Sequence, residues 1–179
     1  MKNILATAFI LMSISLGAQT SVSALANELL LPNAGGALRG AEFYSDVNGI
    51  KKVESRRSNI ELYEEDKQAD GALYLYYELA LSNGKTADID YHFDASGNLF
   101  SLSTNTYTTS DEQAEDLYDY LLGYLKSNFK NTGTDNEGWQ TFEGRRQNYT
   151  YKLYLQMKEQ GMWKKSKYVG FDMAVVQSN

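Results

Sequence analysis

The chain has 179 residues, a formal net charge of −6, one histidine and no cysteine. The missing cysteine excludes disulfides, thiol nucleophiles and thiolate metal sites. The acidic balance argues against nucleic acid as a partner, because phosphate binding relies on dense Lys and Arg surfaces.

The first 26 residues have the pattern of an export signal. Lys2 gives a positive start, residues 4–18 are almost wholly apolar, and the small residues of 22–24 and 24–26 suit a signal peptidase. The apolar run is shorter than the roughly 18 residues of a membrane-spanning helix. We therefore expect a signal peptide over 1–26 and a mature protein that is not an integral membrane protein. Such a protein is periplasmic or secreted, and the lack of disulfides favours a bacterial source.

The mature part has the length of one ordinary domain. Residues 27–50 contain Pro32 and several glycines, so we interpret them as an irregular N-terminal arm. The Leu29–Leu31 run within the arm either docks on the core or forms a short strand. The remaining residues, 51–179, are expected to form a single α+β domain.

Strand signals fill the first half of that domain. Leucines alternate with polar or tyrosine positions over 73–81, and alternation of the same kind continues over 86–93. Asn83-Gly84 between them is a strong hairpin signal, because both positions of a type I′ turn need positive φ. The predicted strands are 59–65, 73–81, 86–93 and 99–107.

A single convincing helix follows, from about Asp111 to Phe129. Ser110 with Gln113 forms a capping box, and an apolar stripe that includes Leu117, Leu121 and Leu125 recurs at helical spacing. We expect this stripe to lie on the sheet as part of the core.

The remaining residues predict a linker and a final hairpin. Residues 131–138 are polar and punctuated by glycine, whereas 149–158 and 168–175 alternate as strands do. The predicted fold class is therefore α+β, with a single antiparallel β-sheet of about six to seven strands packed against one long α-helix.

Charge is distributed unevenly along the chain. Residues 27–143 hold 9 basic and 21 acidic side chains, whereas residues 144–179 hold 7 basic and 2 acidic ones. The basic segment either forms a patch that attracts an acidic partner or pairs loosely with acids of the same domain.

Tyrosine is the feature most typical of a binding surface. The chain has 14 tyrosines, and tyrosine is enriched in protein interfaces, although it also favours strands for reasons of propensity alone. If the strands that carry them are neighbours, Tyr74 and Tyr76 form one surface with Lys152 and Tyr154. The predicted binding residues are Tyr74, Tyr76, Lys152, Tyr154, Arg145, Arg146, Lys164 and Lys165.

Signals for catalysis and for metal binding are weak. Asp88, Asp90 and His92 project from one face of a predicted strand, which invites a metal interpretation, but any half-exposed hairpin places alternate residues in this way. We predict no metal site, no cofactor and no catalytic residue. The sequence therefore favours a non-enzymatic exported binding protein with a protein partner, of the inhibitor, immunity or envelope-factor kind. The alternatives are a carrier of a small apolar or glycan ligand in a pocket between sheet and helix, and a carboxylate-based hydrolase.

Overall fold

The structure, a computed structural model, describes residues 21–146, 148–162 and 165–176. Most of the predicted signal peptide thus lies outside the described residues. The helices are α1 (Val22–Leu30), α2 (Val47–Glu54) and α3 (Asp111–Asn128), with a short 3-10 turn, η1, at Pro32–Ala34. The strands are β1 (Ile60–Lys67), β2 (Leu73–Ala80), β3 (Thr86–Phe93), β4 (Leu99–Tyr107), β5 (Lys130–Thr134), β6 (Gln140–Arg146), β7 (Tyr149–Gln160) and β8 (Ser166–Val175).

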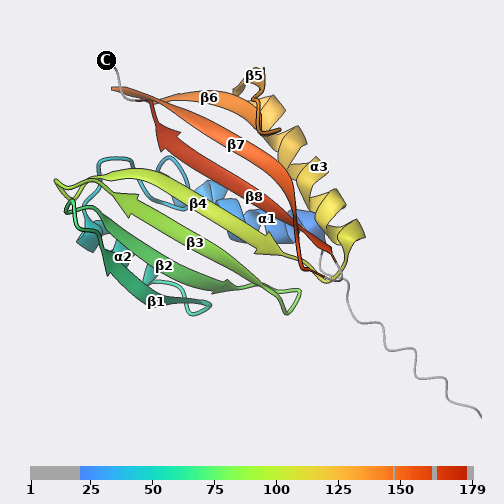
Figure 1. The fold of residues 1–179 in the computed structure, drawn as a ribbon, viewed down its shortest axis with the longest axis horizontal. Coiled ribbons are helices and arrows are strands. Elements are labelled where there is room, and N and C mark those ends of the chain that lie inside the picture. The colour runs from blue at the N-terminus through green and yellow to red at the C-terminus, as the bar shows by residue number, and fades with distance from the viewer. Residues whose placement is uncertain (1–20, 147, 163–164, 177–179) are drawn as a thin grey trace, which may run out of the picture.

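All eight strands belong to one open antiparallel sheet with the order β1-β2-β3-β4-β8-β7-β6-β5. Two four-stranded meanders therefore meet side by side at the β4·β8 pair (Figure 1). The α+β class and the single antiparallel sheet are confirmed, but the predicted count of six to seven strands is wrong. The uncounted strands are β5 and β6, which flank a tight turn at Asp135–Gly138 and carry little apolar alternation.

Each helix starts at a residue whose side chain satisfies a free backbone N–H, as N-caps do. Ser110 accepts from the Gln113 amide at 3.1 Å, which confirms the predicted start of the long helix. Asp46 caps α2 by accepting from the Gly49 amide at 2.7 Å, and Ser21 caps α1. The two short helices lie in or beside the segment that the sequence led us to treat as irregular.

The three helices lie on one side of the sheet, and the core is the layer between them and the strands (Figure 1). Buried positions alternate along β2, β3, β7 and β8, and the stripe of Leu117, Leu121 and Leu125 on α3 faces them. Leu25 and Leu29 of α1 join the same core, with Leu25 completely buried. The helix α1 therefore belongs to the packed domain, and it spans the junction at which the sequence predicts signal cleavage.

A buried polar network fastens the N-terminal segment to the sheet. The Arg39 side chain is fully buried, and its guanidinium donates to the Glu54 carboxylate at 3.2 Å and to the Glu28 and Leu29 carbonyls at 2.8 Å. Glu54 also accepts from Tyr91 of β3 and from Arg57. The network thus joins the end of α1, the end of α2 and a central strand.

Within the described part of the chain, no helix combines the length and the apolar character needed to cross a membrane.

Candidate functional site

No helix of the described residues covers the second face of the sheet, which we call the open face (Figure 1). Side chains that alternate with the core positions project from it. Its central cross-strand row consists of the directly opposed residues Glu64, Tyr76, Asp90, Ser103, Asp172, Tyr154 and Thr141. A row of acids and tyrosines therefore crosses most of the width of the sheet.

Aromatic rings gather at the β1–β4 end of the open face. The Tyr74 and His92 rings lie 4.5 Å apart between centroids, and the Tyr76 ring is 6.3 Å from Tyr74 and 6.0 Å from Tyr63. Phe100 extends the group, because its ring lies 6.3 Å from His92. Tyr63 is 57% exposed and the other four are half-buried, so the rings present a partly apolar surface to solvent.

Carboxylates surround these rings. Glu64 and Asp66 on β1 lie opposite Tyr76 and Tyr74, and Asp88 and Asp90 follow on β3. Among the described residues, the open-face positions of β1–β3 hold no lysine or arginine to balance them. We call the set the acidic–aromatic patch, and it comprises Tyr63, Tyr74, Tyr76, His92, Phe100, Glu64, Asp66, Asp88 and Asp90.

Asp90, at the centre of the patch, has an unusual environment for a carboxylate. Burial raises its pKa to about 6, with Asp88 and Asp172 adding repulsion. Its Oδ1 is buried without a hydrogen-bond partner in the described residues, and so is Oδ1 of Asn105. Asp88 and Asp172, by contrast, accept from the hydroxyls of Tyr107 at 2.9 Å and Ser103 at 2.6 Å. Within the patch, Asp90 is therefore the carboxylate with a buried oxygen that lacks a donor among the described residues.

Burial lowers the pKa of His92 and so disfavours the charged form of its ring. Among the described residues, no group of three His, Cys, Asp or Glu side chains is arranged to hold a metal ion, and this includes Asp88, Asp90 and His92 on β3. The arrangement thus supplies hydrogen-bond acceptors and ring surfaces.

The structure brings together only part of the predicted binding set. Tyr74 and Tyr76 lie in the acidic–aromatic patch. Lys152 and Tyr154 point from the same face, but β3, β4 and β8 separate their strand from β2. Four strand spacings place the two pairs roughly 19 Å apart. They do not form the contiguous Tyr/Lys surface that neighbouring strands would create.

The basic residues are dispersed as well. Arg145 is exposed on the open face, whereas Arg146 lies on the helix side, where it pairs with Glu42. Lys165 pairs with Glu159 at 2.9 Å, and Lys164 lies outside the described residues. The C-terminal segment thus places its positive charges on both sides of the sheet.

Two aromatic residues of the patch, Tyr63 and Phe100, were not predicted from the sequence, and both lie at irregularities of strand register. Tyr63 falls where the β1·β2 register shifts, and Phe100 where the β3·β4 register shifts. A bulge of this kind breaks the two-residue alternation on which face assignment depends. The one signal in the sequence is the spacing of Leu99 and Leu102, which are both buried although three residues apart.

Comparisons of the chain with protein-family models, with curated proteins and with solved structures gave no match. The geometry defines the class of protein. It is an α+β domain in which helices cover one face of an eight-stranded antiparallel sheet and the other face is open.

Proposed function

We propose that the chain is a non-enzymatic binding protein of the bacterial periplasm or extracellular space, and that it captures a cationic protein segment on the acidic–aromatic patch. The observation that carries this proposal is Asp90, a carboxylate of raised pKa with an unpartnered oxygen, set among acids and partly exposed rings. A lysine or arginine of a partner that contacts the exposed carboxylates around Asp90 supplies the positive charge that the patch lacks.

The composition of the patch favours a protein as the partner. Tyrosine rings give large contact areas at low entropic cost, and their faces attract the cationic groups of Lys and Arg. Tyr63, 57% exposed, is already accessible for such a contact. The surrounding carboxylates add long-range attraction, which raises association rates for a positively charged partner.

The alternative of a carboxylate-based hydrolase receives less support. A glycoside-cleaving pair of carboxyl groups flanks the scissile bond at separations of roughly 5–9.5 Å. Asp88 and Asp90 instead lie along one strand of an open sheet face, opposite Glu78 and Tyr76 of β2. Their position suits recognition of a surface better than enclosure of a substrate.

A capture experiment with matched variants tests the proposal. The full chain is used as bait in envelope and secreted extracts, beside the Asp88→Asn/Asp90→Asn double variant and beside Lys152→Gln at the far end of the open face. We expect one stoichiometric, basic partner that the double variant loses and Lys152→Gln retains. Its affinity falls when salt is raised from 0.15 to 0.5 M, because charge attraction is then screened.

Three outcomes contradict the proposal. The double variant retains the partner as well as the unmodified chain does, or Lys152→Gln alone loses it, or no protein is captured from either extract. Fractionation of the producing cells tests the predicted location separately.

A further inference from the structure

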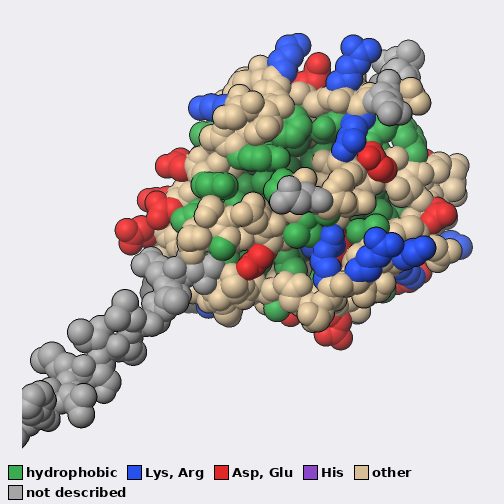
Figure 2. Space-filling view, turned by 180° about the vertical axis from the view of Figure 1, so that it is seen from behind, with side chains coloured by type: hydrophobic (Ala, Val, Ile, Leu, Met, Phe, Trp, Pro, Cys, Tyr) green, Lys and Arg blue, Asp and Glu red, His purple; other side chains and the backbone are tan. Residues whose placement is uncertain are grey.

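A recess beside the core lies on the helix side of the sheet, which is the side opposite the acidic–aromatic patch. Apolar side chains reach the surface across the middle of this side (Figure 2). Here the structure contains a cavity of about 190 Å³ between the segment after α1, the end of α3 and strands β6–β8. The apolar residues around it include Leu30, Leu38, Leu125, Phe129, Leu153 and Phe171.

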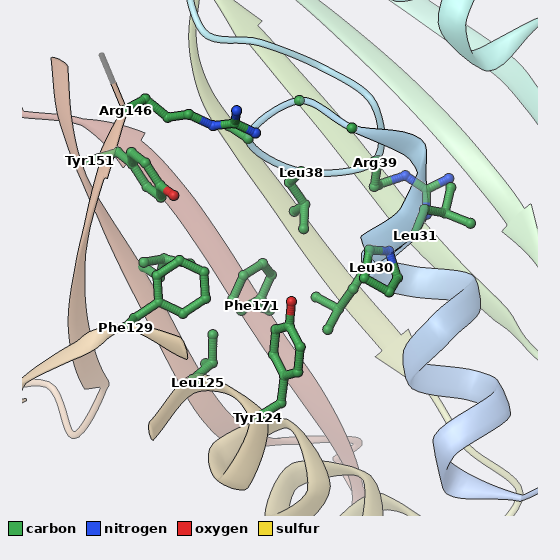
Figure 3. A pocket seen from close by; sticks show the side chains of 15 residues that line it. Leu30, Leu31, Leu38, Arg39, Tyr124, Leu125, Phe129, Arg146, Tyr151 and Phe171 are labelled. Atoms are coloured by element: carbon green, nitrogen blue, oxygen red, sulfur yellow. The ribbon is translucent and has the colours of Figure 1, made fainter. Parts of the chain in front are cut away.

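Two tyrosine hydroxyls point into this apolar space (Figure 3). Tyr151 comes from β7 and is only 5% exposed, and Tyr124 comes from the end of α3. Neither hydroxyl has a hydrogen-bond partner among the described residues. Neither hydroxyl is among the buried polar atoms of the described residues that lack a partner, so both reach the open space of the cavity and can donate to an acceptor placed there.

The fold holds the Tyr151 ring in this position. Gly144 lies directly opposite Tyr151 on β6, and a Cβ atom at Gly144 would come within 2.4 Å of the Tyr151 ring. The ring also contacts Phe43 and Phe129, with centroids 5.8 and 6.3 Å away. A missing side chain on one strand and aromatic contacts on two sides thus fix the direction of the hydroxyl.

Arg146 places a positive charge at the rim of the cavity. Arg146 lines the cavity with its side chain 40% exposed, and its Nη1 lies 3.5 Å from Glu42 Oε1. That distance is longer than the 2.7–2.9 Å or so of a strong charge-assisted hydrogen bond. Glu42 also accepts from the Tyr149 hydroxyl at 2.7 Å. Arg146 therefore keeps donors for a further anion, since a guanidinium carries five N–H groups.

We propose that this cavity binds a small monocarboxylate, with its apolar body among the leucine and phenylalanine side chains and its carboxylate between Arg146 and the Tyr151 hydroxyl. The volume sets the size, because an apolar cavity of about 150 Å³ accommodates benzene. A phenyl ring with a one-carbon arm to the carboxylate meets both requirements. This site is independent of the proposed protein-binding function, because it lies on the opposite side of the sheet.

The test uses the full chain and two matched probes, phenylacetate and its neutral isostere phenylacetamide. Titrations are followed by calorimetry and by NMR chemical shifts of the cavity residues. We expect phenylacetate to bind at least tenfold more tightly than the amide, with the largest shifts at Tyr151 and Phe171. Shifts confined to other residues, or no shift up to 10 mM phenylacetate, overturn the proposal.

Neighbouring arginines on opposite faces provide the controls. Arg146→Gln is expected to reduce phenylacetate affinity to that of the amide, whereas Arg145→Gln leaves it unchanged. Tyr151→Phe removes only the hydroxyl and is expected to weaken phenylacetate three- to tenfold. Thermal unfolding of each variant verifies the fold. Equal effects of the two arginine variants, or full affinity in Tyr151→Phe and Arg146→Gln, overturn the assigned geometry.

Discussion

Asp90 is a carboxylate whose surroundings in the folded chain disfavour its charged form. Its half-buried carboxyl has a pKa of about 6, because burial and then the neighbouring Asp88 and Asp172 disfavour the charged form. Tyr76 and Ser103 lie directly opposite Asp90 on the neighbouring strands. The positive charge of Lys158 acts on the pKa of Asp172 and lowers it. At neutral pH an ionised Asp90 therefore lowers the free energy of unfolding of the chain.

The pH dependence of stability follows from this shift. In the unfolded chain an aspartate releases its proton near pH 4, whereas in the folded chain Asp90 holds it to about pH 6. Stability is thus lost as the pH rises through this interval, and the loss persists above it. We expect Asp90→Asn to raise the free energy of unfolding by about 1–2 kcal/mol at pH 7, after allowance for solvent screening, and by almost nothing at pH 3.5.

Urea unfolding at the two pH values measures the difference between variant and unmodified chain. Asp119→Asn on the exposed side of α3 serves as the control and is expected to change stability equally at both. Parallel pH profiles for Asp90→Asn and the unmodified chain would contradict the environment assigned to Asp90.

Arg39 and Glu54 form the second residue-scale feature, a buried ion pair that bridges two helices and a strand. Removal of one partner leaves the other charge buried and alone, which costs about 3–5 kcal/mol in comparable cases. We expect Arg39→Met and Glu54→Gln each to lower the free energy of unfolding by this amount. The double variant is expected to lose clearly less than the two single losses combined.

A double-mutant cycle in urea measures that coupling. Arg145→Met, on the exposed open face, is the control and should change stability by no more than about 0.5 kcal/mol. Strict additivity of the Arg39 and Glu54 losses would show that the two side chains do not act as a pair.

At the scale of elements, the sequence predicts those strands and helices whose apolar residues recur with a regular period. The strand 86–93 and the strand 99–107 match β3 and β4, and the helix from Asp111 is confirmed to within a residue at its end. The segment β5 was missed because all five of its residues are exposed and none is apolar, so only pairing with β6 makes it a strand. Helix α2 was missed because Asn48-Gly49 resembles a turn, whereas Asp46 caps it as a helix start.

The candidate site was predictable only as far as alternation holds. Tyr74 and Tyr76 project from the open face as the pattern of β2 predicts. Their distance from Lys152 depends on which strands are neighbours, and no local pattern specifies that β4 pairs with β8. The position of Tyr151 in a cavity could not be predicted either, because α3 and the segment after α1, which are distant in sequence, form the walls of that cavity.

Helix α1 yields a prediction about the N-terminus of the folded domain. Its residues Leu25 and Ala26 are buried, and a chain that begins at Asn27 lacks both as well as the capping Ser21. We expect such a chain to be less stable than one that begins at Gln19 by about 3 kcal/mol or more, the usual cost of losing one buried leucine.

Chemical denaturation of the two chains measures the loss. Leu25→Ala in the longer chain is the matched control and should reproduce most of it, because Leu25 is completely buried. Equal stability of the two chains would contradict the packing of α1 into the core.

At the scale of the whole molecule, one core extends beneath both meanders. Ile89 and Tyr91 of the first meander and Leu153 and Phe171 of the second belong to the same buried cluster, and the β4·β8 pair joins the two halves through seven paired residues on each strand. The molecule is thus one packing unit with exposed strands, β1 and β5, at its two edges.

Native-state hydrogen exchange tests whether the two meanders unfold as one unit. We expect the slowest amides in β3, β4, β8 and β7, with the same opening free energy in both halves, because all of them open only with the global transition. Amides of β5 are expected to exchange much faster, since its residues are all exposed. An opening free energy that differs by more than about 2 kcal/mol between β3 and β7 would show two separately unfolding halves.

The order of elements gives each half the same plan. Helix α2 precedes the meander β1–β4, helix α3 precedes the meander β5–β8, and the last strands of the two meanders pair antiparallel at the centre. A pair of this kind is related by a two-fold rotation, so two copies of one helix-and-meander unit would assemble in the same way as a homodimer. In a single chain the two halves differ in sequence, so each can carry a different surface. Here one half carries acids and tyrosines on its outer surface, and the other lines a recess on the inner side together with residues 30–39.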